Sequence, residues 1–314
     1  MKLLILFNSY SGKGYKDNII ELLKDELSSK FEVIDVYHTE GEKSITNKIL
    51  SDGSNYDVVL TVGGDGTVNE AINGIMRLEN KPRLAIIPYG TCNDIAKSTG
   101  NKRVKKAIKN IKQDLYTNLN VFKINNNFFA YGLATGGVSN ISYKVSKKAK
   151  NMLGKNAYYL NTLKTVFEKN PKIKLSIDYD DNHIEGKFYL MLAMNTRYLA
   201  GVKVKGWKKT YNTSKLHIVL FKEQHRITGF ISFVLYVLFG FKNKNMVIFD
   251  ADNLKITTYE KTEFNTDGEK YEPKHSLDII SISNELEVYC KKKIIKLDEK
   301  REKKANKEKA TISK

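Results

Sequence analysis

Apolar and polar positions alternate with two different periods in the first third of the chain. Short apolar runs form the segments LLILF, FEVIDVY, YDVVLTV and RLAIIPY, and the residues between them place apolar side chains at helical spacing, as at Ile19, Leu22, Leu23 and Leu27. The runs predict buried strands, and the spacing of three and four predicts helices that cover them. Alternating strands and helices are typical of an open parallel sheet covered on both faces. We therefore predict an α/β domain over residues 1–118.

Beyond this domain the pattern changes to strands that are joined by turns. The runs LHIVLF, NMVIF, NLKITTY and DIISIS are separated by turn residues, and DYDDNHIEGKFYLMLAMN predicts a hairpin about Asp181 and Asn182. We predict a mostly antiparallel β-sandwich domain over residues 119–289. Residues 139–168 differ, because their apolar stripe at helical spacing predicts a helix with a break near Gly154.

The charge of the chain points to anionic partners. Its 53 Lys and Arg outnumber 35 Asp and Glu, which gives a formal net charge of +18. Residues 290–314 are especially basic and predict a solvated helix or tail. Such an excess favours phosphate-rich surfaces, although charge alone does not choose between nucleic acid, an anionic membrane and a nucleotide. No recognisable nucleic-acid-binding module accompanies it, so we expect no nucleic-acid partner.

Cysteine content and apolar segments indicate a cytoplasmic protein. Cys92 and Cys290 are too few for a disulfide framework or a cysteine metal site. The first apolar run ends at Asn8 without a cleavage site for a signal peptide. The segment from Ile227 to Phe241 is apolar but shorter than the about 20 residues that span a bilayer. It is either a helix packed in the second domain or a surface that inserts into a membrane.

Three unusual loops follow the predicted parallel strands: NSYSGKG, GGDGT and GTCND. The carboxyl ends of parallel strands meet at one edge of a sheet, where ligands bind. Gly63, Gly64 and Gly66 would let backbone amides approach a phosphate at the start of a helix that begins near Val68. Asp65 would repel a bare phosphate and therefore indicates a metal ion such as Mg²⁺, although a glycine-rich turn with a capping aspartate is the alternative.

The motifs GGDGTVNEAINGI, GTCNDIAKS, NSYSGKG, LGKNAYYLNTLK and NTDGEKYE together resemble the diacylglycerol kinase catalytic family, most closely its bacterial soluble lipid kinases. The match runs in order from Leu3 to about Tyr289, whereas GGDGT alone is shared with the NAD kinases and sphingosine kinases. The resemblance implies an enzyme that uses ATP and Mg²⁺ to phosphorylate a lipid hydroxyl. It also implies an active site in the cleft between an α/β domain and a β-sandwich domain.

The resemblance carries over to specific positions of this sequence. It implies ATP binding by Asn8, Ser9, Tyr10, Ser11, Gly12, Thr39, Gly63, Gly64, Asp65, Gly66, Thr67, Val68, Asn69, Glu70, Gly90, Thr91 and Asp94. Asp65 and Asp94 would hold Mg²⁺ through water, and Asp267 and Glu269 would be the catalytic carboxylates, one of which takes the proton from the lipid alcohol. The simpler alternatives are a turn threonine at Thr39, a helix N-cap at Asp94, and an ordinary hairpin turn at Asp267.

The sequence departs from the family pattern in two places. Asn120 stands where relatives carry aspartate, and Asn212, Thr213 and Ser214 replace residues that form a structural magnesium site. Neutral side chains are poor ligands for this cation, so we predict no tightly held structural metal in the second domain. We lean towards an altered substrate as the consequence, although lowered activity is the alternative.

These observations define the expected function. We expect a cytoplasmic, peripherally membrane-associated lipid kinase that binds ATP and acts at an anionic membrane surface, with diacylglycerol as the first candidate acceptor. A sphingoid base, phosphatidylglycerol or a polyprenol is the alternative acceptor. A regulator that binds nucleotide or lipid without catalysis is the alternative of another class, and assembly as a homodimer is left open.

Overall fold

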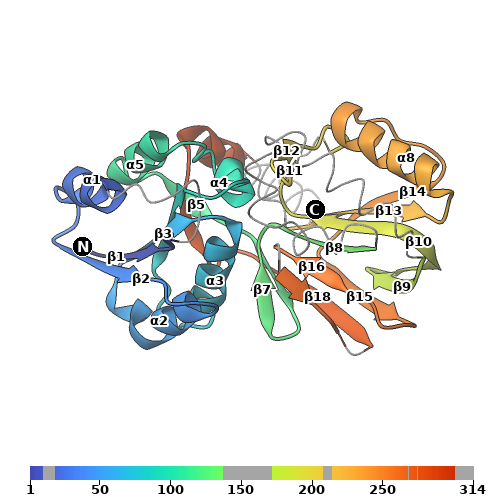
Figure 1. Cartoon of the computed structure of the whole chain (residues 1–314), viewed down its shortest axis with the longest axis horizontal. Helices are drawn as coiled ribbons and strands as arrows, with labels where there is room; N and C mark the ends of the chain where they lie inside the picture. The colour runs from blue at the N-terminus through green and yellow to red at the C-terminus, as the bar shows by residue number, and fades with distance from the viewer. Residues whose placement is uncertain (10–17, 137–171, 208–213, 268, 274, 301–314) are drawn as a thin grey trace, which may run out of the picture. The chain divides into compact units, whose positions relative to one another are not determined.

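The computed structural model describes residues 1–9, 18–136, 172–207, 214–267, 269–273 and 275–300 (Figure 1). The chain divides into two compact units. The first comprises Met1–Asn120 and Ser283–Lys314, and the second comprises Val121–Ile282. Each unit has its own sheet and its own apolar core.

The first unit is built on a six-stranded sheet with the order β2–β1–β3–β4–β19–β5. Its strands are β1 (Lys2–Phe7), β2 (Val33–His38), β3 (Val58–Gly63), β4 (Arg83–Pro88), β5 (Tyr116–Asn118) and β19 (Glu287–Tyr289). The pairs are parallel except for β5, which runs antiparallel to β19. All six residues of β3 are buried, as expected for a strand that is covered on both faces.

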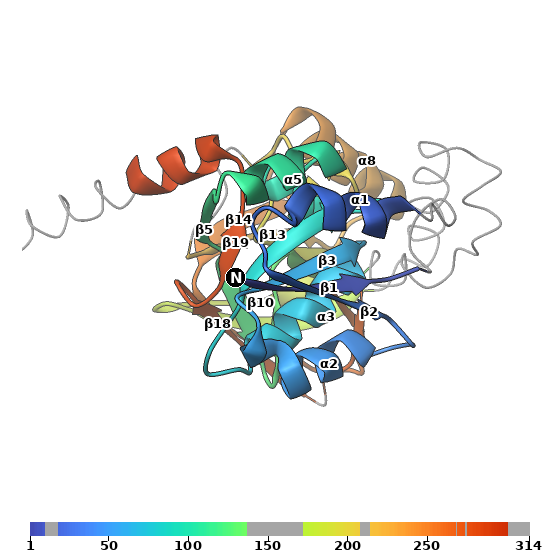
Figure 2. The same cartoon turned by 90° about the vertical axis from the view of Figure 1, so that its left-hand side faces the viewer.

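Helices cover both faces of this sheet. Figure 2 shows α1 (Asn18–Leu27) and α5 (Val104–Lys112) on one face, and α2 (Ser44–Asp52) and α3 (Asp65–Ile75) on the other. The short elements η1 (Gly53–Asn55) and α4 (Asp94–Ser98) also belong to the unit, and residues 292–300 are helical. The α1 side chains Ile19, Leu23 and Leu27 are buried against the sheet, which confirms that their spacing marks a core-facing helix.

The end of the predicted second domain differs from the structure. We expected that domain to extend to residue 289, but the chain returns to the first unit from Ser283 onward. There β19 lies between β4 and β5, and the Arg83 guanidinium donates to the Glu287 carboxylate over 2.7 Å. A strand of three residues carries no signal for the sheet that it joins, because its composition suits either sheet.

The second unit is mostly antiparallel β structure. Its strands are β6 (Val121–Ile124), β7 (Asn127–Phe129), β8 (Gly132–Gly136), β9 (Ile173–Tyr179), β10 (Asn182–Met194), β11 (Tyr198–Leu199), β12 (Val202–Lys203), β13 (Leu216–Lys222), β14 (Met246–Ala251), β15 (Asn253–Thr258), β16 (Phe264–Thr266), β17 (Glu269–Tyr271) and β18 (Ser276–Ile282). Among the described residues, β11 and β12 pair separately and the other strands form one sheet. Strands from distant parts of this sheet share one core, so it curls around its apolar side chains. An α/β domain followed by an antiparallel β domain confirms the predicted fold class.

The strand β10 joins the parts of this sheet. Its first half pairs with β9 and its second half pairs with β8 and β13, with an irregularity between Phe188 and Leu190. The predicted hairpin forms between β9 and β10, and Asp180 in its turn has a positive φ of 46°. The helix predicted over residues 139–168 falls outside the described residues.

The apolar segment that begins at Ile227 forms the helix α8 (Arg226–Phe239). Phe233, Tyr236 and Val237 on one side of α8 are buried against β10 and β13, whereas Ile227 and Ile231 on the other side are exposed. Neither alternative of the sequence analysis therefore describes the whole helix. Within the described parts of the chain, no helix combines the length and apolar character that crossing a bilayer requires.

The two cysteines differ in environment and predict selective labelling. Cys290 is fully buried, and this burial raises the pKa of its thiol to about 12, whereas Cys92 is partly exposed. Because the thiolate is the reactive species, alkylation at about pH 8, near the ordinary thiol pKa, is expected to modify Cys92 alone in the folded protein. Mass spectrometry of peptides checks the prediction. Modification of both cysteines at equal rates without denaturant would contradict it.

Candidate active site

The Thr67 side chain explains why residue 63, at the end of β3, is a glycine. A Cβ built on Gly63 would lie 2.3 Å from the Thr67 hydroxyl oxygen, so the threonine fills the space that a side chain would need. Thr67 is buried, and its hydroxyl accepts a hydrogen bond from the Asn8 amide over 3.1 Å. Two residues predicted to bind ATP thus join the ends of β1 and β3 to the first turn of α3.

Gly90 is explained by the approach of two loops. A Cβ on Gly90 would lie 2.4 Å from the Gly64 Cα and 2.9 Å from the Asn93 side-chain oxygen. The backbones of the β3–α3 and β4–α4 loops therefore touch where both lack side chains. Two of the three loops that the sequence predicted to meet at this sheet edge, GGDGT and GTCND, do so, whereas most of NSYSGKG falls outside the described residues.

Gly64 has no comparable reason within the described chain. Its backbone is extended, with φ of −94° and ψ of −169°, which any residue adopts. A Cβ there would meet only the Gly90 Cα, at 3.4 Å, which is an ordinary van der Waals distance. The residue is the N-cap of α3, where backbone amides point away from the helix. A glycine that the described structure does not require, at a helix N-terminus, fits a ligand that approaches the backbone there.

Both helices at this edge begin earlier than predicted. α3 begins at Asp65 rather than near Val68, and α4 begins at Asp94 with Asn93 as its N-cap. The alternative that Asp94 is itself the N-cap is therefore wrong. The sequence-based boundaries failed because glycine and aspartate favour turns but are also accepted in a first helical turn.

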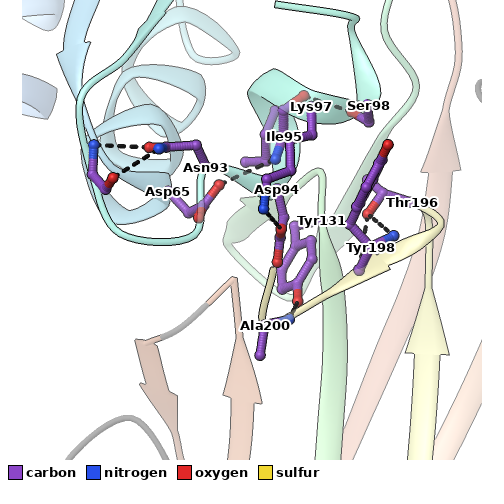
Figure 3. Close-up of polar contacts among 11 residues, drawn as sticks. Asp65, Asn93, Asp94, Ile95, Lys97, Ser98, Tyr131, Thr196, Tyr198 and Ala200 are labelled. Atoms are coloured by element: carbon purple, nitrogen blue, oxygen red, sulfur yellow. Dashed lines mark hydrogen bonds and ion pairs between the residues drawn. The ribbon is translucent and has the colours of Figure 1, made fainter. Parts of the chain in front are cut away.

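Asp65 links the two helices. Its carboxylate accepts a hydrogen bond from the backbone N–H of Ile95 over 3.1 Å, so it satisfies a donor in the first turn of α4 rather than of its own helix (Figure 3). Asp94 is 1% exposed, and its carboxylate lies 3.2 Å from the Lys97 ammonium. The two aspartates predicted to hold Mg²⁺ are thus both fixed at the start of α4.

Asn93 shapes the second loop. Its side chain accepts from the Gly90 N–H and donates to the Gly90 carbonyl, both over 2.8 Å, and its backbone has a positive φ of 55° (Figure 3). Asparagine tolerates this conformation better than most residues do. The sequence analysis placed Asn93 in the matching motif without giving it a role, and its position three residues after a glycine was the available signal.

The other predicted ATP-binding residues of the first unit lie around the same sheet edge in different settings. The Thr39 N–H donates to the Phe7 carbonyl over 3.0 Å, and the Glu70 carbonyl accepts from the Thr46 hydroxyl over 2.9 Å. Val68 is buried in the core, so its side chain supports the helix. Asn8, Ser9, Gly66, Asn69 and Thr91 are described and partly or fully exposed, whereas Tyr10, Ser11 and Gly12 fall outside the described residues.

Asp267 is the buried carboxylate of the second unit. It follows β16 in a tight turn and has a positive φ of 50° and an exposed fraction of 1%. Its carboxylate accepts hydrogen bonds from three successive backbone N–H groups, those of Ala130, Tyr131 and Gly132, each over 2.8 Å. Three such donors stabilise the charged carboxylate in the protein interior. Asp267 therefore anchors the segment that leads into β8.

Glu269 begins the partner strand of this hairpin. β17 pairs with β16 so that Glu269 lies opposite Thr266, and Asp267 stands between them in the turn. The motif thus forms the hairpin turn that was the alternative interpretation. Asp267 in this turn is buried, however, and so does not belong to an ordinary surface turn. The amide donors of residues 130–132 were not predicted, because nothing in the segment AYG marks it as a carboxylate ligand.

The structure describes only some of the residues that depart from the family pattern. Asn120 is 5% exposed, at the end of the first unit. Ser214 is exposed, and Asn212 and Thr213 fall outside the described residues. Within the described ranges, no three His, Cys, Asp or Glu side chains gather as a metal-binding group. The predicted absence of a structural metal stays a prediction.

Comparisons with known proteins agree with the motifs. A profile of the diacylglycerol kinase catalytic domain matches residues 2–124. A protein of Bacillus subtilis (strain 168) named diacylglycerol kinase is 26% identical over 278 residues, which are 84% of this chain and 88% of that protein. The match to that protein extends well beyond the profile.

Solved structures share the fold along most of the chain. A crystal structure of a putative diacylglycerol kinase from Bacillus anthracis str. Sterne superposes with a TM-score of 0.77 at 28% identity, covering 93% of this chain and 97% of that one. An NAD kinase from Archaeoglobus fulgidus, solved in complex with ATP, has a TM-score of 0.52 at 12% identity and covers 93% of this chain and 95% of its own, which shows a shared fold alone. The glycine loops, the buried DGE aspartate and these likenesses together support a bacterial diacylglycerol-kinase-like family for this chain.

Proposed function

We propose that this protein is an ATP-dependent lipid kinase that transfers the γ-phosphoryl group of ATP to the hydroxyl of a lipid, with diacylglycerol as the acceptor. Similarity to diacylglycerol kinases supports the reaction class. The proposal also includes Mg²⁺ as cofactor and action at a membrane surface. Phosphoryl transfer requires that phosphates be positioned and their charge neutralised, and that the attacking hydroxyl be oriented.

The observation that carries the proposal is the backbone at Gly64. Nothing in the described chain prevents a side chain there, and the position caps the N-terminus of α3. Amide N–H groups at a helix N-terminus bind phosphate oxygens, and a Cβ would occupy the space that the phosphate needs. The ATP bound to an NAD kinase of the same fold supports a nucleotide ligand for this site.

The surrounding residues fit the proposed nucleotide and its metal ion. Asp65 and Asp94 supply oxygen atoms at the start of α4, and Mg²⁺ is held in proteins by one or two carboxylates together with substrate phosphates. When bound, the ion neutralises charge on the phosphates. Asn8 and Thr67, through their mutual hydrogen bond, keep the first loop against α3. These residues bind and orient the nucleotide in our proposal.

In the second unit, we assign catalysis to the DGE turn. Asp267 holds the strand pair β16–β17 in place, because its carboxylate accepts from three amide donors. Glu269 and Asp267 remain the two candidates for the group that accepts the proton of the lipid hydroxyl. A base within hydrogen-bond reach of that hydroxyl is the minimum requirement for the transfer.

The proposal is tested by incubation of the purified protein with labelled ATP and separate lipids: diacylglycerol, a sphingoid base, phosphatidylglycerol and a polyprenol. We expect labelled product from diacylglycerol, and we expect Asp65→Asn to lower kcat/KM about tenfold, as the loss of a group that orients a metal shell typically does. Asparagine keeps an oxygen that can accept from the Ile95 N–H, so the variant removes charge while retaining the contact with α4.

Asp57→Asn is the matched control. The Asp57 carboxylate also accepts a backbone hydrogen bond, from the N–H of Lys2 over 2.7 Å, but it lies at the start of β3 rather than at its carboxyl end. We expect unchanged turnover. Label on another lipid would correct the acceptor, and ATP binding without label on any lipid would favour the regulator instead.

A further inference from the structure

The helix α8 presents a row of apolar side chains to solvent. The residues Ile227, Ile231, Leu235 and Leu238 recur at helical spacing, with Phe239 and Phe241 at the C-terminal end, and their exposed fractions range from 37% to 64%. We call these six residues the α8 apolar face. Most monomeric proteins keep large apolar patches out of water, so such a face indicates a binding surface.

The fold holds this face outward. On the opposite side of α8, Phe233 is buried, and the Tyr236 hydroxyl lies 2.7 Å from His217 Nε2. The other ring nitrogen, His217 Nδ1, lies 2.7 Å from the Asp250 carboxylate. Burial raises the pKa of the Tyr236 hydroxyl, which therefore stays protonated and able to hydrogen-bond with His217. These contacts fix the rotation of α8 on the sheet, so its exposed side chains cannot turn inward.

The C-terminal end of α8 is tied to a basic segment. Gly240 has a positive φ of 81° and ends the helix, while the N–H groups of Lys205 and Gly206 donate to the carbonyls of Val237 and Tyr236 over 2.8 Å and 3.1 Å. These bonds satisfy carbonyl groups that a helix end leaves without partners. They also place Lys205, which is exposed, beside the two exposed phenylalanines.

Positive charge borders the α8 apolar face at its C-terminal end. The sequence from residue 226 to residue 249 contains no Asp or Glu. Lys242 and Lys244, directly after Phe241, are exposed, and Lys203 on β12 is exposed where that strand packs beside α8. An apolar face with aromatic residues at its end and lysines at its border matches the chemistry of an anionic bilayer surface.

We propose that the α8 apolar face docks onto the surface of an anionic lipid bilayer. This inference rests on the proposed lipid kinase function, because an enzyme whose acceptor lies in a bilayer needs a surface that binds it. The apolar side chains enter the boundary between head groups and acyl chains, while the lysines bind anionic head groups. A second copy of the chain is the competing occupant of this face, and the test below distinguishes it.

The test is co-sedimentation of the full chain with vesicles of phosphatidylcholine alone or mixed with phosphatidylglycerol. The wild-type protein is expected to bind the anionic vesicles, and the double variant Ile231→Asp, Phe241→Asp is expected to lower its partition coefficient at least about tenfold. Lys242→Glu with Lys244→Glu is expected to lower binding to the anionic vesicles about tenfold. Ile280→Asp is the matched control, because Ile280 is an apolar residue of the second unit that is 50% exposed on β18.

Kinase activity separates this inference from the function on which it rests. For the double variant, the ratio of activity on diacylglycerol in vesicles to activity on a dispersed short-chain diacylglycerol is expected to fall about tenfold. A wild-type protein that binds vesicles through α8 but phosphorylates no lipid would overturn the proposed function and leave the docking surface standing. An active protein whose vesicle binding survives the double variant would overturn the docking surface, as would a wild-type dimer that this variant converts to monomers without loss of vesicle binding.

Discussion

Replacement of Asp267 by asparagine is expected to lower kcat for lipid phosphorylation by about a thousandfold, within the range that a positioned acid–base group contributes. The carboxylate accepts from three backbone N–H groups, whereas an asparagine side chain offers one oxygen and turns an NH₂ group towards the remaining donor. The turn must then shift, and with it the strand pair that carries Glu269. KM for ATP is expected to change little, because the proposed nucleotide site lies in the first unit.

The same substitution is expected to destabilise the protein. A buried N–H left without an acceptor, together with the lost charge-assisted bonds, costs about 2–4 kcal/mol in the free energy of unfolding. Denaturant titration measures this change, and steady-state kinetics under conditions where the variant is folded measure kcat.

Asp180→Asn is the matched control for Asp267→Asn. Asp180 also occupies a hairpin turn with positive φ, but its carboxylate is exposed. We expect a change within about 0.5 kcal/mol and unaltered kcat. An Asp267→Asn variant with full activity and unchanged stability would show that the three amide bonds are dispensable and would remove Asp267 from the proposed site.

The pattern of apolar residues was sufficient for the fold class but not for every connection. Alternating runs predicted the parallel sheet because strands buried on both faces are apolar throughout. The return of β19 to that sheet was missed, since a strand of three residues has the same apolar character in either unit. For α8, the absence of charged residues after Arg226 concealed its two faces, because many exposed and buried positions are apolar alike.

The candidate site was predicted in its residue types more than in its contacts. The loop motifs and the family resemblance singled out Asp65, Gly90 and Asp267, but they did not reveal that Asp65 binds the next helix or that Asp267 binds the amides of residues 130–132. Both contacts join residues that are distant in sequence, and backbone N–H donors have no residue-specific signature. Only the folded chain shows that close contacts require glycine at positions 63 and 90 but not at position 64.

Gly64→Ala and Gly90→Ala are expected to distinguish a glycine that ATP binding requires from a glycine that the packing of the loops requires. Alanine at position 90 places its Cβ 2.4 Å from the Gly64 Cα, so the loops must move apart, at a cost of about 1–3 kcal/mol typical of overpacking. Alanine at position 64 meets only an ordinary contact and is expected to cost less than about 1 kcal/mol.

For ATP affinity we expect the opposite order, with a specific loss in Gly64→Ala. In Gly64→Ala the new methyl group occupies the proposed phosphate position, so ATP affinity is expected to fall about a hundredfold in a protein of nearly native stability, as a displacement of about 1 Å can cause. Isothermal titration of each variant with ATP and thermal denaturation without ATP measure the two quantities. If Gly64→Ala bound ATP as tightly as the wild type, the phosphate would lie elsewhere and the glycine at the start of α3 would lose its proposed reason.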